Sequence, residues 1–391
     1  MIASLLLAAA ALPQGAAPAP TAPDPAAHLN PPRAVAIRKA VEWLVANQRP
    51  SGAWGSHHSP RPIEVLCSVP GGHHVFRVAT TALCVMALDR SPYQTEASRA
   101  AADRGVDLIL AEHEVKRADM LEHYTVWALG YTLQCLSERL LAQPDDPRAE
   151  EMGAVCRRMI EKLELYQCLD GGWGYLSLQE LKTYKPSFTS MSFTTATCLV
   201  GLARAREAGF ELPPEMIRKA VDSVDRCETA MKSFTYGELW RKGRPNSPSV
   251  NHAKSAACRG PACLESILLF GRERTHEDAT RAMDRLLVDH TKFQIASLRR
   301  PIPHESHYAI SGYFYLYGYY YAGVFQRRLP DADRLRYAPY LEKAVNVCRQ
   351  PDGSYWDYPL YSYHKPYGTA YALLTLSEVD QIHRTLGSPG S

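Results

Sequence analysis

The chain has 391 residues, of which 46% are hydrophobic and 22% are charged, values that are ordinary for a globular protein with a sizeable core. A formal net charge of +3, with no dense run of lysine and arginine, argues against a nucleic-acid partner. The length would allow two domains, but helical repeats along the chain predict one, because the units of a repeat array share a core.

Residues 1–17 resemble a secretory signal peptide. The apolar run MIASLLLAAAAL is followed by the small residues Gly15, Ala16 and Ala17. The run is too short to span a bilayer, so we expect no transmembrane segment in the mature chain. No lysine or arginine precedes Arg33, so the usual basic segment is missing. We expect a secreted or periplasmic protein, the alternative being a cytosolic protein with a disordered leader, and residues 18–33 read as an Ala/Pro-rich linker.

From residue 34 onward the chain alternates two kinds of helical segment. The first kind carries apolar residues at helical spacing on one face. It is predicted at 34–48, 97–114, 150–167, 214–226, 275–289 and 337–349. The second kind is apolar or small on nearly every side, as in helices that are buried all round. It is predicted at 77–88, 120–141, 190–206, 253–270, 308–325 and 367–379.

This alternation predicts an all-α fold, an (α/α)6 toroid of six helical hairpins over residues 34–380. An outer amphipathic ring around an inner buried ring covers the apolar helices and leaves no end unit exposed. No stretch shows the period-two alternation of a half-buried strand. Residues 381–391 are predicted to be a disordered tail.

The ten cysteines do not read as a disulfide framework. Cys84, Cys135 and Cys198 lie inside apolar helical runs, where cysteine usually behaves as a small buried hydrophobe. A second group lies nearer to loops and helix starts, where pairing and free thiols both remain open. Its members are Cys67, Cys168, Cys258 and Cys263.

One turn recurs between helices. It reads NQRPSGAW before Gly55, QCLDGGWGY from Gln167 and QPDGSYWDY from Gln350. Its tryptophans, Trp54, Trp173 and Trp356, are separated by near multiples of about 60 residues, the length of a two-helix unit. Glycine permits a tight turn, glutamine can bond backbone groups at helix ends, and tryptophan packs over the next hairpin. We therefore assign these residues to structure, not to chemistry.

The first turn carries a family resemblance. It matches, at every defined place, the QW motif of the squalene and oxidosqualene cyclases, at Ala40, Trp43, Leu44, Gln48, Gly52 and Trp54. In the second copy Lys162 replaces an aromatic residue, and the copy at Gln350 is one residue short. The chain thus resembles the prenyltransferase/squalene-cyclase repeat proteins over roughly residues 34–380. The resemblance implies an α/α toroid whose central cavity binds an apolar ligand of isoprenoid type.

The family's catalytic signatures are missing from this sequence. Neither Asp-x-Asp-Asp nor Asp-Cys-Thr-Ala, the acid motifs of the cyclases, occurs, and neither does the diphosphate-binding pattern Asp-Asp-x-x-Asp. The nearest strings, Asp331-Ala-Asp333 and Asp145-Asp146, are expected in loops outside the inner ring. The sequence therefore leaves catalysis undecided.

Side chains at the starts of inner helices should converge on one mouth of a toroid. Histidine recurs there, at His73, His74, His123, His252, His307 and His364. Such histidines are often only caps or packing residues, but together they can supply acid–base groups or hold a metal ion such as zinc. The catalytic candidates are Glu122, His123, His307 and Tyr308.

A second set of residues near this mouth is predicted to bind the ligand. Arginine there can hold an anion, and aromatic faces can contact apolar or stacking ligands. The set comprises His74, Arg77, Tyr124, Trp127, Arg259, Tyr315, His364 and Tyr367. The alternatives are a solvated rim for the charges and simple ring packing for the aromatics.

Three functions remain open from the sequence. The first is an exported toroid that binds an apolar or aromatic-stacking small molecule, either as a divergent terpenoid cyclase or prenyltransferase or as a non-catalytic lipid binder. The second is a carbohydrate-active (α/α)6 enzyme, either a glycan lyase or a hydrolase. The third is a non-catalytic toroid that binds another protein, whose identity the sequence does not indicate.

Overall fold

The computed structural model describes residues 32–57, 73–115, 124–175, 190–230, 232–238, 253–298, 314–357 and 362–387. Within these ranges the secondary structure is helical, and extended pairing is limited to two isolated bridges, Glu228 with Phe234 and Arg349 with Tyr355. No helix in the described ranges is long and apolar enough to cross a bilayer. The predicted signal peptide and nearly all of the predicted linker lie outside the described residues.

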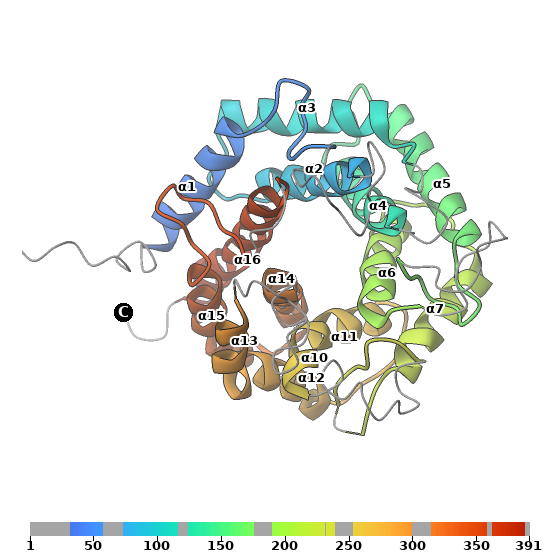
Figure 1. The fold of residues 1–391 in the computed structure, drawn as a ribbon, viewed down its shortest axis with the longest axis vertical. Coiled ribbons are helices and arrows are strands. Elements are labelled where there is room, and N and C mark those ends of the chain that lie inside the picture. Colours follow the sequence, from blue (N-terminus) through green and yellow to red (C-terminus); the bar gives the residue numbers. More distant parts are fainter. Residues whose placement is uncertain are drawn as a thin grey trace, which may run out of the picture.

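The helices form two concentric rings (Figure 1). The outer ring consists of α1 (Arg33–Ala46), α3 (Glu96–Glu112), α5 (Ala149–Leu165), α7 (Pro214–Arg226), α12 (His276–Asp284) and α15 (Asp331–Asn346). The inner ring consists of α2 (His74–Asp89), α4 (Thr125–Ala142), α6 (Ser192–Glu207), α11 (Gly260–Leu268), α14 (Tyr315–Phe325) and α16 (His364–Leu386). Each inner helix contacts the next, and α16 contacts α2, so the ring is closed. The predicted (α/α)6 toroid is confirmed.

Short helices complete two of the hairpins. They are α10 (Ala253–Ala256), η2 (Ala257–Arg259), η3 (Arg285–Asp289), α13 (Thr291–Ser297) and η5 (Gln326–Arg328). The sequence pattern did not predict α13. It also treated the segment from residue 253 as one continuous helix, whereas η2 interrupts it before Gly260 and Pro261 begin α11. Proline is well accommodated in a first helical turn, because the missing N–H has no partner there.

Burial follows the predicted difference between the rings. In α7 the buried residues Met216, Ala220, Val221 and Val224 make one stripe, whereas α6 is buried on all sides from Ser192 to Ala203. An inner helix is covered by its own outer helix and by both inner neighbours. The outer helix has solvent on its far face, which explains the two composition patterns.

Two predicted boundaries are corrected. Helix α15 begins at Asp331, not at residue 337, so Asp331 and Asp333 lie in its first turn, where acidic side chains favour the positive end of the helix dipole. Helix α16 continues to Leu386, past the predicted start of the tail, because Ile382 is buried and Arg384 pairs with Asp380. Of the predicted tail, residues 388–391 lie outside the described residues.

The nine cysteines in the described ranges are all buried. Burial raises the pKa of the Cys227 thiol to about 11, and that of Cys168 to about 12. Thiols of this kind are poor nucleophiles, because the reactive thiolate is scarce. The cysteines of helices α2, α4 and α6 are therefore core residues, as predicted.

The first recurrent turn, Gln48–Trp54, ties α1 to α3. The Gln48 amide donates to the carbonyl oxygen of Gly52 at 2.8 Å and to that of Ala101 in α3 at 2.7 Å. The Trp54 indole N–H donates to the Leu44 carbonyl in α1 at 2.8 Å. Gly52 has a φ of 87°, a left-handed conformation that favours glycine. The turn is structural, as its residues indicated.

The second turn repeats this geometry one-third of the chain later. The Gln167 amide donates to Gly171 at 2.6 Å and to Met216 in α7 at 2.8 Å, and the Trp173 indole donates to Leu163 in α5 at 2.8 Å. Gly171 has a φ of 99°. Since glutamine spans from its own turn to the next outer helix in both copies, the motif sets the spacing between neighbouring hairpins.

In the third turn the glutamine stands one position later than in the first two. The Gln350 N–H donates to the Ser354 carbonyl at 2.7 Å, just as the Arg49 N–H donates to Ala53 at 2.9 Å. Gln350 therefore takes the place of Arg49, and Arg349 stands where Gln48 would be. The glutamine consequently does not bridge to another outer helix in this turn; its amide donates to the nearby Cys348 carbonyl at 2.9 Å.

A fourth turn has the same backbone but no sequence signature. The Thr229 N–H donates to Ser233 and the Lys232 N–H donates to Thr229, both at 2.8 Å. Phe234 is buried in the place of the tryptophan, and Lys232 takes the place of the glycine with a φ of 55°. Among the described residues other than glycine, a positive φ is found at Lys232 alone. The sequence does not reveal this copy, because the glutamine, glycine and tryptophan of the other turns are all replaced.

Lys232→Gly should give a more stable protein than Lys232→Ala, by about 1 kcal/mol, because glycine accepts the left-handed backbone and alanine does not. Both variants lose the same ion pairs, to Glu228 at 3.4 Å and Asp278 at 3.3 Å, so their difference isolates the backbone strain. Chemical denaturation of the two variants measures it. Equal stabilities would contradict the assignment of strain to this turn.

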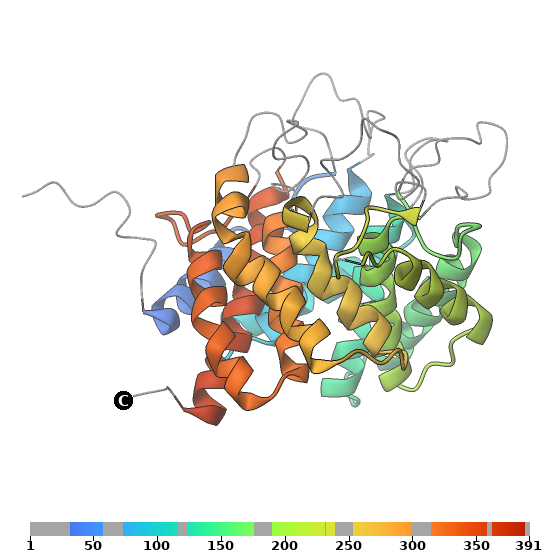
Figure 2. The same ribbon diagram turned by 90° about the horizontal axis from the view of Figure 1, so that it is seen from below.

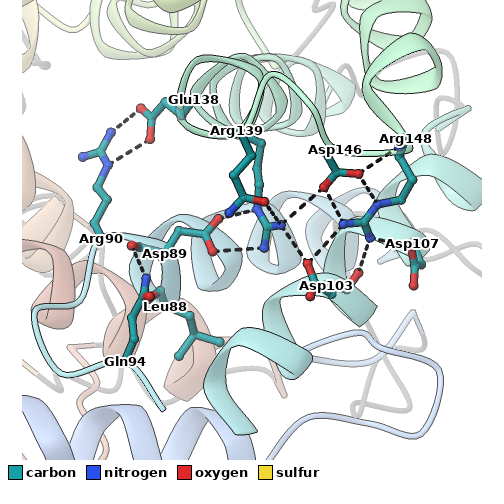
Figure 3. A network of polar contacts seen from close by, with 11 residues as sticks. Leu88, Asp89, Arg90, Gln94, Asp103, Asp107, Glu138, Arg139, Asp146 and Arg148 are labelled. Carbon is teal, nitrogen blue, oxygen red and sulfur yellow. Dashed lines mark hydrogen bonds and ion pairs between the residues drawn. The ribbon is translucent and has the colours of Figure 1, made fainter. Parts of the chain in front are cut away.

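Ion pairs hold the helices together at the C-terminal ends of the inner ring (Figure 3). Arg139 of α4 donates to Asp89, at the end of α2, and to Asp103 of α3, both at 2.7 Å. Arg148 joins Asp103 at 3.1 Å and Asp146 at 2.8 Å. Hydrogen bonds from Arg148 lower the pKa of Asp146 to about 2. This network links two hairpins.

Further ion pairs continue around the same end. Arg90 pairs with Glu138 of α4 through Nε at 2.9 Å, Arg328 with Glu265 of α11 at 2.5 Å, and Arg327 with Glu378 of α16 at 2.6 Å. At this end of the toroid, charged side chains of neighbouring inner helices are therefore held in ion pairs.

Candidate functional site

The opposite end of the inner ring is aromatic. The first turns of the inner helices gather there, at the side away from the end of α16 and the chain terminus (Figure 2). Six of its rings are partly exposed. They are Phe76, Tyr124, Trp127, Tyr175, Tyr236 and Tyr367, which we call the aromatic collar.

The collar rings are linked to one another around the ring axis. Tyr124 lies between Phe76 and Tyr175, with ring centroids 5.0 and 5.1 Å apart. The buried ring of Phe193 contacts Trp127 at 6.0 Å and Tyr236 at 5.2 Å. These contacts come from the starts of α2, α4 and α6 and from two of the turns, so the collar is a property of the closed ring.

The circuit closes through the last hairpin. Tyr363 stacks on Phe76 with centroids 5.1 Å apart and lies 6.5 Å from Tyr367, the collar residue of α16. Tyr367 in turn packs on Tyr371 at 5.7 Å. The rings from the first and last hairpins thus meet at the seam where α16 contacts α2.

Buried tyrosines fill the ring below the collar. Their hydroxyl groups bond one another and helix polar groups: Tyr131 meets Tyr371 at 2.5 Å, and Tyr317 donates to the Phe193 carbonyl at 3.0 Å. Tyr320 accepts from the Gln134 amide at 3.2 Å. Burial raises the pKa of the Tyr131, Tyr317 and Tyr371 hydroxyls, and neighbouring tyrosines raise it further. These groups therefore stay neutral. The region directly beneath the collar is therefore occupied by buried, neutral tyrosine side chains.

The recurrent turns deliver collar residues. Tyr175 follows Trp173 by two positions, and Tyr236 follows Phe234 by two positions. The hydroxyl groups of Tyr175 and Tyr236 are in hydrogen-bond contact. Neither residue is among the candidates that the sequence indicated. The signal that would have found them is their fixed offset from the buried aromatic residue of each turn.

The same offset after Tyr355 leads to Asp357, which is fully buried. Its Oδ2 accepts the backbone N–H of Leu316, in the first turn of α14, at 3.0 Å, and its Oδ1 accepts the Tyr367 hydroxyl at 3.1 Å. In the part of the chain that the structure describes, the carboxylate that accepts a hydrogen bond from a collar residue is that of Asp357. The sequence did not indicate Asp357, because the turn that carries it was assigned to structure and site residues were expected at the starts of inner helices.

Four predicted ligand-binding residues lie at the collar. Tyr124, Trp127 and Tyr367 belong to it. His364 is buried beside it, edge-on to both Tyr363 and Tyr367 at 5.1 Å. Whether they bind a ligand stays a prediction.

His74 and Arg77 lie in a polar cluster between α2 and α3. Arg77 pairs with Glu112 at the end of α3 and lies 3.1 Å from His74 Nδ1 and 3.3 Å from His57 Nδ1. Burial, and next the charge of Arg77, lower the pKa of His74. The charge of Arg77 is therefore already matched by Glu112, which argues against an anion site at this residue.

Two further predicted residues lie away from the collar surface. Tyr315 is fully buried, and its hydroxyl donates to the Ala344 carbonyl of α15 at 2.9 Å, so it packs between the inner and outer rings. This position differs from the predicted one near the mouth of the toroid. On α14 it is Tyr317 that points toward the other inner helices, where its hydroxyl bonds Phe193 of α6. Arg259 is also fully buried, with Nη2 donating to the Phe234 carbonyl at 3.1 Å and its guanidinium 5.6 Å from the Tyr236 ring. Burial lowers its pKa.

The four catalytic candidates, Glu122, His123, His307 and Tyr308, lie outside the described residues, as does His252. Of the other rim histidines, His73 packs on Phe76 and Tyr363, both at 5.6 Å. In the described part of the chain no three His, Cys, Asp or Glu side chains are grouped so that they could hold a metal ion.

Comparison with solved structures assigns the architecture. A type II terpene cyclase from Scytonema superposes with a TM-score of 0.51 at 13% identity, covering 90% of this chain and 99% of its own. The chain is an (α/α)6 toroid. A possible GH105 family member from Klebsiella pneumoniae gives 0.52 at 15% identity, covering 89% of this chain and 93% of its own. An α-1,6-mannanase of Salegentibacter, GH76A, gives 0.53 at 8% identity, covering 90% and 100%.

No protein-family model and no curated protein sequence matches the chain. At these identities the structural likeness establishes the fold of the toroid alone. The similar structures include both a terpene cyclase and glycoside hydrolases, which is the same division of functions that the sequence left open.

Proposed function

We propose that the protein binds an apolar ligand of isoprenoid type at the aromatic collar. The observation that carries the proposal is the set of partly exposed rings at one end of the inner ring, which contact one another directly or through the buried rings of Phe193 and Tyr363. Partly exposed aromatic side chains gain free energy when an apolar group covers them, and their faces fit flexible hydrocarbon chains and allylic groups. The proposal concerns binding, because the described residues hold no pair of carboxylates at the collar.

The similar structures lend support without deciding the ligand. One of them is a terpene cyclase variant from Scytonema in complex with geranylgeranyl dihydroxybenzoate, a substrate with a long apolar chain. Another is a GH76A variant in complex with α-1,6-mannotetrose. A glycan would also stack on aromatic rings, so mannotetraose is the comparison ligand for the binding test.

Equilibrium dialysis of the purified chain against geranylgeraniol and against mannotetraose tests the proposal. We expect the isoprenoid to be retained, and Phe76→Ala and Tyr124→Ala each to weaken its binding about tenfold, because each removes an aromatic contact worth about 1 kcal/mol or more. Tyr340→Ala is the matched control, since Tyr340 lies on outer helix α15 and is 44% exposed. It should bind as the wild type does.

Two outcomes would overturn the proposal. Isoprenoid binding that is insensitive to Phe76→Ala and Tyr124→Ala would place the ligand elsewhere. Retention of mannotetraose instead, lost in the same two variants, would move the assignment to glycans. Thermal unfolding of each variant checks that the toroid remains intact.

A further inference from the structure

Arg285 carries a buried positive charge. It is the first residue of the short helix η3 and is only 9% exposed. Its Nη1 is fully buried and has no hydrogen-bond partner in the part of the chain that the structure describes. A guanidinium keeps its proton in proteins, so Arg285 cannot avoid the cost of burial by becoming neutral. Because buried charges are ordinarily paired, this side chain points to an external anion.

The acids beside Arg285 in the sequence do not offset its charge. The carboxylate of Asp284 is engaged elsewhere, since its Oδ1 accepts from Arg336 of α15 at 2.7 Å. Asp289, at the other end of η3, is exposed to water. Burial, and next the charge of Arg281, lower the pKa of Arg285, and the opposing effect of Asp289 is smaller than either. The surroundings of Arg285 therefore leave its charge uncompensated.

Two further basic side chains lie near Arg285. One is His290, whose backbone N–H donates to the Arg285 carbonyl at 3.1 Å in the π-helical turn of η3. The other is Lys254 of α10, which contacts η3; its Nζ lies 4.8 Å from the centre of the Phe293 ring of α13. Burial lowers the pKa of His290, Asp289 raises it, and the charges of Arg285 and Lys254 lower it again. The three basic groups are thus within electrostatic range of one another.

The backbone around these groups is held in place. Gln294 of α13 is fully buried; its amide donates to the Lys254 carbonyl and accepts from Cys258 Sγ at 3.2 Å. The Thr291 hydroxyl donates to the Leu287 carbonyl of η3 at 2.6 Å. The helices α10, α12 and α13 accordingly lie together in one sector of the toroid (Figure 1). Turns of π-helix are rare and often occur at functional sites.

We propose that Arg285 binds an oxyanion of the phosphate type, with Lys254 and His290 as flanking donors. The planar guanidinium matches two oxygens of a phosphate group, and the lysine ammonium adds a second positive charge. None of the three residues belongs to the aromatic collar. The inference therefore goes beyond the proposed function and does not depend on it.

Calorimetric titration of the purified chain with inorganic phosphate, at an ionic strength held constant with sodium chloride, tests the proposal. We expect saturable binding by the wild type. Arg285→Met and Lys254→Met should each weaken it about tenfold or more, because each removes a charged hydrogen-bond donor. Arg281→Met is the matched control, since Arg281 lies one turn earlier, is 47% exposed and pairs with Glu277. It should bind phosphate as the wild type does.

Thermal unfolding gives an independent measurement. Without phosphate, Arg285→Met should have a higher unfolding midpoint than the wild type, because methionine fills the site without a buried charge. Phosphate should raise the midpoint of the wild type but not that of Arg285→Met. No phosphate binding by the wild type, unchanged binding in both Arg285→Met and Lys254→Met, or a lower midpoint of Arg285→Met without phosphate would each overturn the proposal.

Methyl phosphate distinguishes two sources of the same chemistry. If it binds as tightly as inorganic phosphate, the site takes the phosphate group of a larger molecule. If it binds much more weakly, the site takes the free ion. Either result supports an oxyanion site at Arg285.

Discussion

Gly52→Ala should lower the free energy of unfolding by about 3 kcal/mol. The residue has a φ of 87°, which costs an alanine about 1 to 2 kcal/mol. In addition, a Cβ atom at this position would lie 2.3 Å from the Arg104 carbonyl oxygen of α3, so the two hairpins must move apart. Overpacking of this kind typically adds about 1 to 3 kcal/mol.

Gly209→Ala is the matched control for this effect. Gly209 has nearly the same backbone, with a φ of 90°, but a Cβ atom there would meet nothing within 4 Å. Its loss should be limited to the backbone term of about 1 to 2 kcal/mol. Denaturant unfolding of both variants gives the difference. Equal losses would show that the close approach of the turn to α3 contributes nothing to stability.

Arg139→Met should destabilise the protein by about 1.5 to 3 kcal/mol, because Asp89 and Asp103 lose the charged hydrogen-bond donor that they share. The Arg139 side chain is 4% exposed and bonds Asp89 and Asp103, while Asp146 lies within 3.9 Å (Figure 3). Methionine fills the volume but provides no hydrogen-bond donor. The loss should therefore come from the acids and not from a cavity.

Arg218→Met provides the comparison on the outer surface. Arg218 pairs with Glu215 and Asp222 on its own helix, but its side chain is 59% exposed. Exposed pairs gain little over hydration, so no measurable change in the unfolding midpoint is expected. A similar loss in both variants would mean that Arg139 acts through helix propensity instead of through its buried contacts.

The two ends of the inner ring differ in their side chains. Paired charges lock the C-terminal ends of the inner helices, and buried tyrosines fill the middle. The collar at the N-terminal ends keeps rings partly exposed. Under the proposed function, the apolar ligand covers the partly exposed rings of the collar. The proposed binding site is therefore assigned to the collar end.

Periodicity and turn chemistry in the sequence were sufficient for the fold. A helix that is apolar on all sides must be covered on all sides, and six such helices alternating with amphipathic ones leave a closed double ring as the economical solution. The Gln48 and Gln167 turns were also correctly assigned to structure, because glycine, glutamine and tryptophan each have one evident role in a tight turn. These are local properties of the chain.

Only the tertiary structure decided which side chains share the collar. Tyr315 and Tyr317 are two residues apart on one helix, yet the first faces α15 and the second the ring interior. Asp357 and Tyr175 reach the collar because a turn, and not a helix start, carries them there. Such placements depend on how helices are rotated about their axes and on backbone turns such as that of Lys232, which keeps its shape without the residues that favour it. Sequence spacing fixes neither, because both are set by packing between segments far apart in the chain.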